Sequence, residues 1–170
     1  MNWSVLTLVG ADQKGIVAAV SKVLFEADCQ LAEASMMRLG GNFAMMLRVG
    51  HVAEMNLAEI LQPVVTAMQL HLHVDDDVPA KPQQLEPDVH ITVYGADRTG
   101  IVAQVTSLLA DAGLHIVDLE TAVGGSSERP VYIMSLEGSA GQGVDALRSA
   151  IQQMSDDIEI SLTEINTLRA

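Results

Sequence analysis

Positive charge is scarce in this chain: nine Lys and Arg residues stand against 22 Asp and Glu, giving a formal net charge of −13. The basic residues are scattered and form no stripe or arm. Because phosphate contacts require clustered Lys and Arg, this balance argues against direct binding to DNA or RNA. Any effect on nucleic acid would have to pass through another protein.

Aromatic residues and cysteine are also few. Aromatic side chains make up 3% of the residues whereas hydrophobic residues make up 49%, so the core is expected to consist of Leu, Ile, Val, Ala and Met. Cys29 is the single cysteine, which excludes an internal disulfide and fits a reducing compartment. Its thiol is either reactive or a small apolar group near the start of a strand, and the usual behaviour of free cysteines favours the second interpretation.

Long apolar runs and nucleotide-binding loops are missing as well. No stretch approaches the ~20 apolar residues that span a bilayer, and residues 1–4 lead into a strand pattern without a basic region or an apolar signal core. We therefore expect a soluble, cytoplasmic protein that does not bind membranes. Neither GxGxxG nor GxxxxGK[ST] occurs, and the glycine-rich segment 138–143 lacks a phosphate-binding Lys, so it is predicted to be an ordinary connection. No nucleophile–base pair is readable, which predicts a protein that is not an enzyme and needs no cofactor.

The chain does contain an internal repeat. Residues 9–17, VGADQKGIV, return as residues 94–102, YGADRTGIV. Each copy follows a β-branched run and precedes apolar residues at helical spacing, which predicts a strand-to-helix turn. We expect Gly10 and Gly95 to allow a backbone turn that a Cβ would resist.

The other repeated residues suggest a loop that could hold a ligand. We expect Asp12 and Asp97 to accept hydrogen bonds from the first N–H groups of the following helix. Gly15 and Gly100 are expected to leave room for the close approach of a strand or a ligand. A loop at a helix N-terminus suits a carboxylate or another anion. The alternative is that the turn only caps the helix and reverses the chain.

The apolar spacing predicts the order βαββαβ in each half of the chain. In the first half the predicted strands are 3–9, 30–39, 43–49 and 69–74, and the predicted helices are 16–27 and 55–68. The first of these strands is expected to be buried on both faces, and Pro63 implies a kink or a boundary in the second helix. In the second half the predicted strands are 89–94, 114–123, 131–136 and 158–165, the helices are 101–112 and 144–154, and residues 124–130 form a long loop.

An acidic, proline-containing stretch separates the two halves and is predicted to be a linker. The predicted domains are therefore 1–74 and 88–170, joined by the linker 75–87. Two βαββαβ units imply an α+β, ferredoxin-like architecture, with two antiparallel four-stranded sheets that each carry both helices on one face. Because open sheets leave unpaired edges, we expect pairing between domains or between chains, such as a homodimer.

Two further clusters could in principle bind metal. His71 and His73 share one face of a predicted strand, and Asp75 continues the period. A solvated or interface face of a terminal strand is the simpler interpretation, because no third ligand is evident. A group of methionines occupies the first predicted hairpin, where packing explains them better than copper binding does: Met36, Met37, Met45 and Met46. No metal site is predicted.

The repeated Gly-Ala-Asp-x-x-Gly-Ile-Val motif, followed by a helix and a strand such as 114–118, LHIVD, resembles ACT domains. Two such units with little else resemble the subfamily of glycine cleavage system transcriptional repressors. The resemblance implies two βαββαβ modules that bind a small amino acid, with glycine as one candidate. It also implies a regulator that acts by contacting a DNA-binding transcriptional activator, which agrees with the acidic charge.

The resemblance also implies where a ligand would bind. In the family, ligands lie at interfaces between domains, against the loop after the first strand and a neighbouring second strand. Transferred residue by residue, the implied ligand-binding residues are Ala11, Asp12, Gln13, Lys14, Gly15 and Ile16, with Ala96, Asp97, Arg98, Thr99, Gly100 and Ile101 in the second unit. Relatives often have proline before the second glycine, where this chain has Lys14 and Thr99. Lys14 and Arg98 are candidates to contact a ligand carboxylate.

The leading hypothesis is thus an amino-acid-responsive transcriptional regulator. One alternative is a protein-interaction module that needs no ligand and uses its sheet edges or the methionine-rich hairpin. Another is a regulatory subunit of an amino-acid biosynthetic enzyme. The identity of the ligand and of the protein partner stays open at this stage, as does the oligomeric state.

Overall fold

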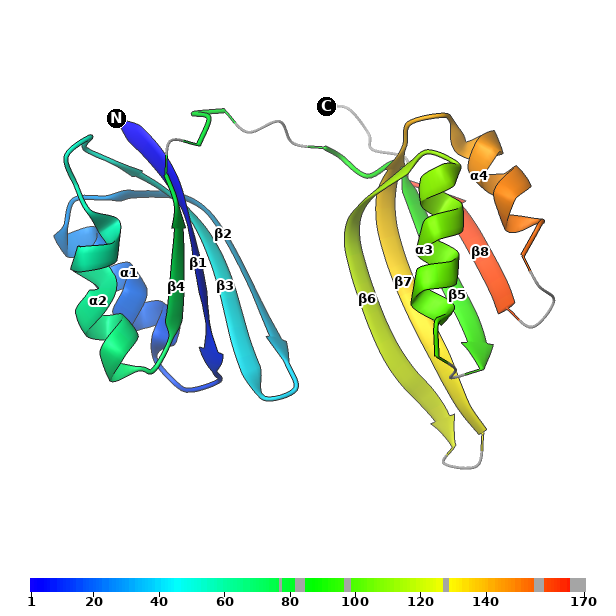
Figure 1. The fold of residues 1–170 in the computed structure, drawn as a ribbon, viewed down its shortest axis with the longest axis horizontal. Helices are drawn as coiled ribbons and strands as arrows, with labels where there is room; N and C mark the ends of the chain where they lie inside the picture. Colours follow the sequence, from blue (N-terminus) through cyan, green and yellow to red (C-terminus); the bar gives the residue numbers. More distant parts are fainter. Residues whose placement is uncertain (77, 82–84, 97–98, 127–128, 155–157, 166–170) are drawn as a thin grey trace. The chain divides into compact units, whose positions relative to one another are not determined.

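The chain folds into two compact units, Met1–Gln83 and Gln84–Ala170. The structure, a computed structural model, describes residues 1–76, 78–81, 85–96, 99–126, 129–154 and 158–165. Each unit is a four-stranded antiparallel sheet with its two helices on one face (Figure 1). The predicted α+β fold of two ferredoxin-like βαββαβ units is confirmed.

The first unit has a sheet with the strand order β2-β3-β1-β4, so β1 lies in its interior and β2 and β4 form its edges. Its elements are β1 (Asn2–Ala11), α1 (Ile16–Glu26), β2 (Gln30–Leu39), β3 (Asn42–His51), α2 (Leu57–Ala67) and β4 (His71–Asp75). Leu6 marks the register, since it pairs with Leu47 of β3 and with Val74 of β4.

The second unit repeats this topology with the strand order β6-β7-β5-β8. Its elements are β5 (Val89–Ala96), α3 (Ile101–Asp111), β6 (Leu114–Ser126), β7 (Arg129–Ala140), α4 (Val144–Ile151) and β8 (Ile158–Glu164). The loop predicted over residues 124–130 is wrong at its described residues, because Gly124 pairs with Val131 and Gly125 with Pro130, while residues 127 and 128 lie outside the described residues. The predicted connection at 138–143 also begins inside β7. Backbone groups alone form the ladder, so glycine and serine can continue a strand whose partner is in place.

The core of each unit lies between the sheet and its two helices. In α1 the buried residues Ile16, Val20 and Leu24 recur every four positions and pack against Leu6 and Leu8 of β1. In α3 the equivalent positions are buried as well. Each such side chain contributes about 1.5–3 kcal/mol when it is fully buried. Helical spacing therefore predicted the core faces correctly.

Two local expectations for the first unit are wrong. β1 is not buried on both faces: Leu6 and Leu8 are buried, whereas Val5 and Thr7 on the other face are only half-buried, because both helices cover the same side. The boundary that Pro63 implied does not occur at that residue, since α2 continues as one helix to Ala67. Proline has no N–H and so removes one backbone hydrogen bond from the helix. Packing of the buried face of α2 compensates for that loss.

Gly10 lies inside β1 and not in a turn. It pairs with Phe43 of β3, and its φ is not in the left-handed region. A Cβ on Gly10 would lie 2.7 Å from Leu70 Cδ2 and 3.2 Å from the Gln69 carbonyl oxygen. Gly10 therefore permits the segment that precedes β4 to approach β1 closely, and the expected turn role is wrong.

The segment after β4 is fastened to the open face of the first sheet. We call residues 78–80 the strap. The Val78 N–H donates to the Trp3 carbonyl oxygen at 3.0 Å, and the Arg48 guanidinium donates to the carbonyl oxygens of Pro79, at 2.9 Å, and of Ala80. The same guanidinium lies 4.4 Å from the centroid of the Trp3 ring.

Candidate functional site

Gly15 is the residue that the turn before α1 requires. It is the N-cap of α1 with φ 93° and ψ 0°, in the left-handed region that a Cβ disfavours. A Cβ there would meet only Met68 Cε, at 4.0 Å. The two glycines of the first copy of the motif therefore exchange the expected roles: Gly10 allows the close approach of a neighbouring segment, and Gly15 adopts the left-handed backbone conformation.

Asp12 does not cap the helix, contrary to expectation. No side chain caps α1, because the left-handed Gly15 separates the Asp12 carboxylate from the first helical N–H groups. Asp12 instead forms an ion pair with Arg38 at the end of β2, and its N–H donates to the Gly41 carbonyl oxygen at 2.9 Å. The first turn of α1 thus keeps N–H groups that no side chain occupies, and these groups carry the positive end of the helix dipole.

Gln13 attaches the loop to the other side of the unit. Its Nε2 donates to the Met68 carbonyl oxygen at 2.7 Å, at the C-cap of α2. The loop after β1 is therefore tied to the β2–β3 turn through Asp12 and to α2 through Gln13. These contacts fix the position of the loop before any ligand arrives.

A cavity of about 300 Å³ lies at the N-terminus of α1, and we call it the loop cavity. This volume is at the lower end of the range of about 300–1,000 Å³ that small-molecule sites occupy. Its lining residues are Asp12, Gln13, Gly15, Ile16, Val17, Ala18, Met36 and Phe43. Four of the predicted residues of the first unit thus line one cavity, whereas Ala11 and Lys14 do not.

The sequence interpretation expected a neighbouring second strand at the ligand site but named none of the residues that β2 and β3 supply to this cavity. Met36 and Phe43 line the cavity, and Arg38 holds Asp12 at its edge. The Gly40-Gly41 turn is the sequence feature that could have predicted this contribution from β2 and β3. A tight hairpin there brings Arg38 opposite Phe43 and places the end of β2 beside the loop that follows β1.

The second unit repeats the turn geometry at its described residues. Gly100 is the N-cap of α3 with φ 89° and ψ −2°, and no side chain caps this helix either. Thr99 is exposed and Ile101 is buried in the core. Ala96 is the last residue of β5, while Asp97 and Arg98 lie outside the described residues.

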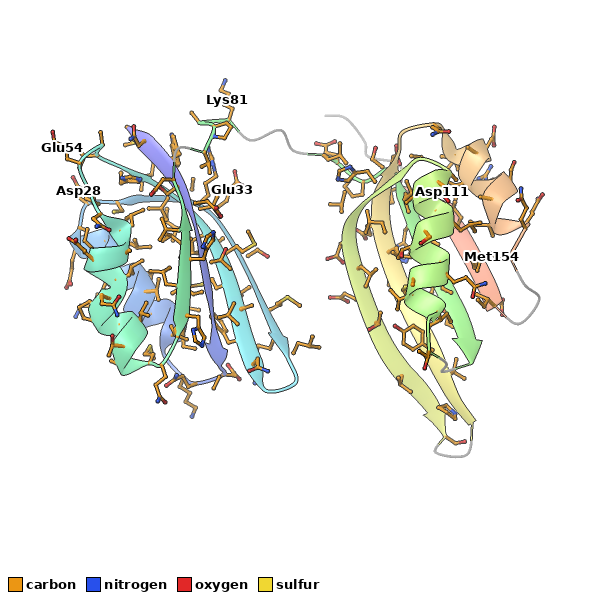
Figure 2. All side chains as sticks on the ribbon, viewed as in Figure 1. Asp28, Glu33, Glu54, Lys81, Asp111 and Met154 are labelled. Carbon is orange, nitrogen blue, oxygen red and sulfur yellow. The ribbon has the colours of Figure 1, made fainter. Side chains whose placement is uncertain are left out.

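Cys29 has the properties of an inert thiol. Burial, and secondarily the negative charge of Asp28 (Figure 2), raise the pKa of the Cys29 thiol, which disfavours the reactive thiolate. Its Sγ lies 3.3 Å from Met55 Sδ. Because the folded state retains this proton at a pH where the unfolded chain has lost it, the thiol stabilises the fold below its usual pKa and less so as the pH rises above it.

Most histidines and methionines of the first sheet are surface groups, whereas Met45 and His51, both of β3, are buried. His73 Nε2 lies 3.1 Å from Asp75 Oδ1, and both side chains are exposed. Met45 is buried in the core, whereas Met36, Met37 and Met46 are each more than half exposed.

Within the described ranges, no helix is long and apolar enough to cross a membrane.

Comparisons with known proteins agree on both units. A family model described as ACT domain matches residues 4–75 and, a second time, residues 88–163. No curated protein sequence matches the chain. Among solved structures, an unknown protein from Galdieria sulphuraria is 24% identical, with 96% of this chain and 98% of that chain covered and a TM-score of 0.75. A "putative glycine cleavage system transcriptional repressor" is 19% identical, with 98% of each chain covered and a TM-score of 0.73. At these identities the likeness concerns the fold.

Proposed function

Because the chain belongs to the ACT domain family, with one copy in each unit, we propose that it is a cytoplasmic regulator that binds a small amino acid and is not an enzyme. ACT domains are regulatory modules, and the similar fold of a protein named as a glycine cleavage repressor supports a role in transcription. The loop cavity carries the proposal, because four residues implied by the family motif line it together.

The charges at the loop cavity match those of an amino acid. Asp12 offers an acceptor for the ammonium group, while Arg38 and the first N–H groups of α1 offer donors for the carboxylate. In this role the Asp12–Arg38 pair opens to accept the zwitterion. The second unit is proposed to bind at the equivalent positions, which are Ala96, Asp97, Arg98, Thr99, Gly100 and Ile101.

The regulatory step is proposed to be contact with a DNA-binding activator. The net charge of −13 disfavours contact between this chain and DNA itself. A ligand that binds one arrangement of the protein more tightly shifts the population toward it, and a few kcal/mol of differential affinity are enough. Amino-acid binding would thereby change how the protein meets its activator.

Calorimetric titration of the full chain with single amino acids tests the binding step. We expect saturable heat with at least one amino acid, and a rise of about 2.7 kcal/mol in the free energy of unfolding at a ligand concentration of 100 Kd. The Asp12→Ala variant is expected to lose affinity at the first site. Arg38 is exposed and Asp12 only partly buried, so their ion pair contributes about 1 kcal/mol to stability and the fold of this variant should remain intact. Absence of heat and of thermal stabilisation with every amino acid at millimolar concentration would refute the proposal.

A second candidate function is that of a protein-interaction module without a ligand. All ten residues of the edge strand β2 are exposed, including Leu31, Met37 and Leu39, and an open apolar edge favours strand pairing with another chain or a second copy. This candidate predicts that the double variant Asp12→Ala/Asp97→Ala binds a partner as the unmodified chain does. The regulator hypothesis predicts that the double variant no longer responds to the amino acid.

A role as the regulatory subunit of a biosynthetic enzyme would predict that the chain co-purifies with that enzyme.

A further inference from the structure

A second cavity lies beside the loop cavity, between α1 and β2, and we call it the apolar cavity. Its volume is about 250 Å³. Met45 and Leu47 of β3, which belong to the core, form part of its lining, together with Leu31 and Ala34 of the edge strand β2. The cavity therefore reaches from the surface to the core without a charged side chain in its lining.

The two cavities are adjacent. Val17 of α1 and Met36 of β2 line both of them, and these two side chains are 45% and 53% exposed. A small molecule can therefore hold its charged groups at the loop cavity while an aliphatic group extends past Val17 and Met36. Methionine suits such a boundary, since its unbranched side chain adapts to the shape of its neighbour.

We infer that the apolar cavity is the side-chain pocket of the amino-acid site in the first unit, and that the ligand is an L-amino acid with an aliphatic side chain the size of leucine. This inference rests on the proposed function, because the loop cavity must hold the ammonium and carboxylate groups. The lining determines the chemical class: apolar walls that reach the core favour hydrocarbon. Glycine would leave this pocket without an occupant and would gain nothing from it.

The second unit differs at the residues that open the pocket. Ala34 pairs with Leu47 in the first unit, and Leu119 pairs with Leu136 at the equivalent place in the second. Leu119 adds an isopropyl group where Ala34 has only a methyl group. Met36, which lines both cavities, pairs with Met45, whereas its smaller counterpart Thr121 pairs with Met134, so the second unit lacks this methionine. The side-chain pocket is thus assigned to the first unit, and the expected stoichiometry for a leucine-sized ligand is one per chain.

Calorimetric titration of the full chain with glycine, L-alanine and L-leucine tests the inference. Each methylene that enters the pocket is expected to tighten binding about fourfold, so L-leucine should bind roughly 50-fold more tightly than L-alanine. The variant Ala34→Leu copies the second unit and fills the pocket. It should lose that advantage, so that L-leucine binds this variant no more tightly than L-alanine does.

The matched control is Ala67→Leu, which adds the same group at an exposed position of α2 that lines neither cavity. This variant should bind L-leucine as the unmodified chain does. If glycine binds as tightly as L-leucine, or if Ala34→Leu keeps the full affinity for L-leucine, the inference is overturned and the proposed function stands. If none of the three ligands binds at millimolar concentration while another amino acid does, the inference fails and the proposed function stands; if no amino acid binds, both fail.

Discussion

Gly10 and Gly15 occupy one short stretch, but the structure needs each glycine for a different reason. A Cβ on Gly10 would collide with Leu70 Cδ2, whereas Gly15 has space around it and a left-handed backbone. Steric crowding and backbone strain respond differently to substitution. Asparagine tolerates the left-handed region but is larger than alanine, so it separates the two causes.

We predict that Gly15→Ala lowers the free energy of unfolding of the first unit by about 1–2 kcal/mol and that Gly15→Asn lowers it less. At Gly10 the order is reversed: Gly10→Ala costs about 1–3 kcal/mol through overpacking, and Gly10→Asn costs more. Urea unfolding followed by the fluorescence of Trp3, the single tryptophan of the chain, measures the first unit selectively. If the same substitution, Ala or Asn, is the more destabilising one at both positions, this explanation is contradicted.

At the scale of elements, α2 contains both a favourable and an unfavourable local feature. Its N-cap Asn56 accepts a hydrogen bond from the Glu59 N–H at 3.2 Å, which satisfies one of the free donors of the first turn. Pro63 lies in the interior of the helix and cannot donate to the carbonyl four residues earlier. Leu57, Leu61 and Val65 form the buried face, so packing compensates for the missing hydrogen bond.

We predict that Pro63→Ala raises the free energy of unfolding of the first unit by up to about 3 kcal/mol, because Pro63 is exposed and its ring adds little packing. Asn56→Ala should change stability in the opposite direction, by about 1 kcal/mol, through loss of the cap. Urea denaturation of the two single variants and of the double variant measures both effects. A destabilised Pro63→Ala protein would mean that the ring makes contacts that outweigh the missing hydrogen bond.

At the scale of the whole molecule, the chain between the two units does not leave the first unit directly after β4. The strap, residues 78–80, lies against the first sheet, where Arg48 binds two of its carbonyl oxygens. Arg48 is almost completely buried, stacks on Trp3 and lies 3.5 Å from Oε1 of Glu33. A buried guanidinium that loses these partners would be costly, so its hydrogen bonds hold the strap in place.

We predict that Arg48→Ala releases the strap and raises the hydrogen-exchange rate of the Val78 amide, which donates to the Trp3 carbonyl oxygen. Arg48→Lys should give an intermediate rate, since an ammonium group retains the charge but lacks the planar donor fork. Hydrogen exchange measured by NMR reads this amide directly. Lys22→Ala, which alters an exposed pair with Glu26 on α1, serves as a control and should leave the Val78 rate unchanged. An unchanged rate in Arg48→Ala would show that the Trp3 contact alone holds the strap.

The local pattern of residues determined most of the fold. Alternation in residues 89–93 and the four-residue spacing of Ile16, Val20 and Leu24 predicted the strands, the helices and their buried faces, because these periods follow from backbone geometry. The internal repeat predicted the two units and located the loop at the N-terminus of α1. Asp12, Gln13, Gly15 and Ile16 then proved to line one cavity.

Only the tertiary structure decided which forces act on those residues. The sequence motif is the same whether Asp12 caps α1 or pairs with Arg38, and the choice depends on where the β2–β3 hairpin brings Arg38. Likewise, the role of Gly10 depends on Leu70, which lies sixty residues further along the chain. The apolar cavity arises between α1 and an edge strand that has Ala34 where the second unit has Leu119. Local periodicity specifies elements, whereas contacts between residues distant in sequence form only when those elements pack.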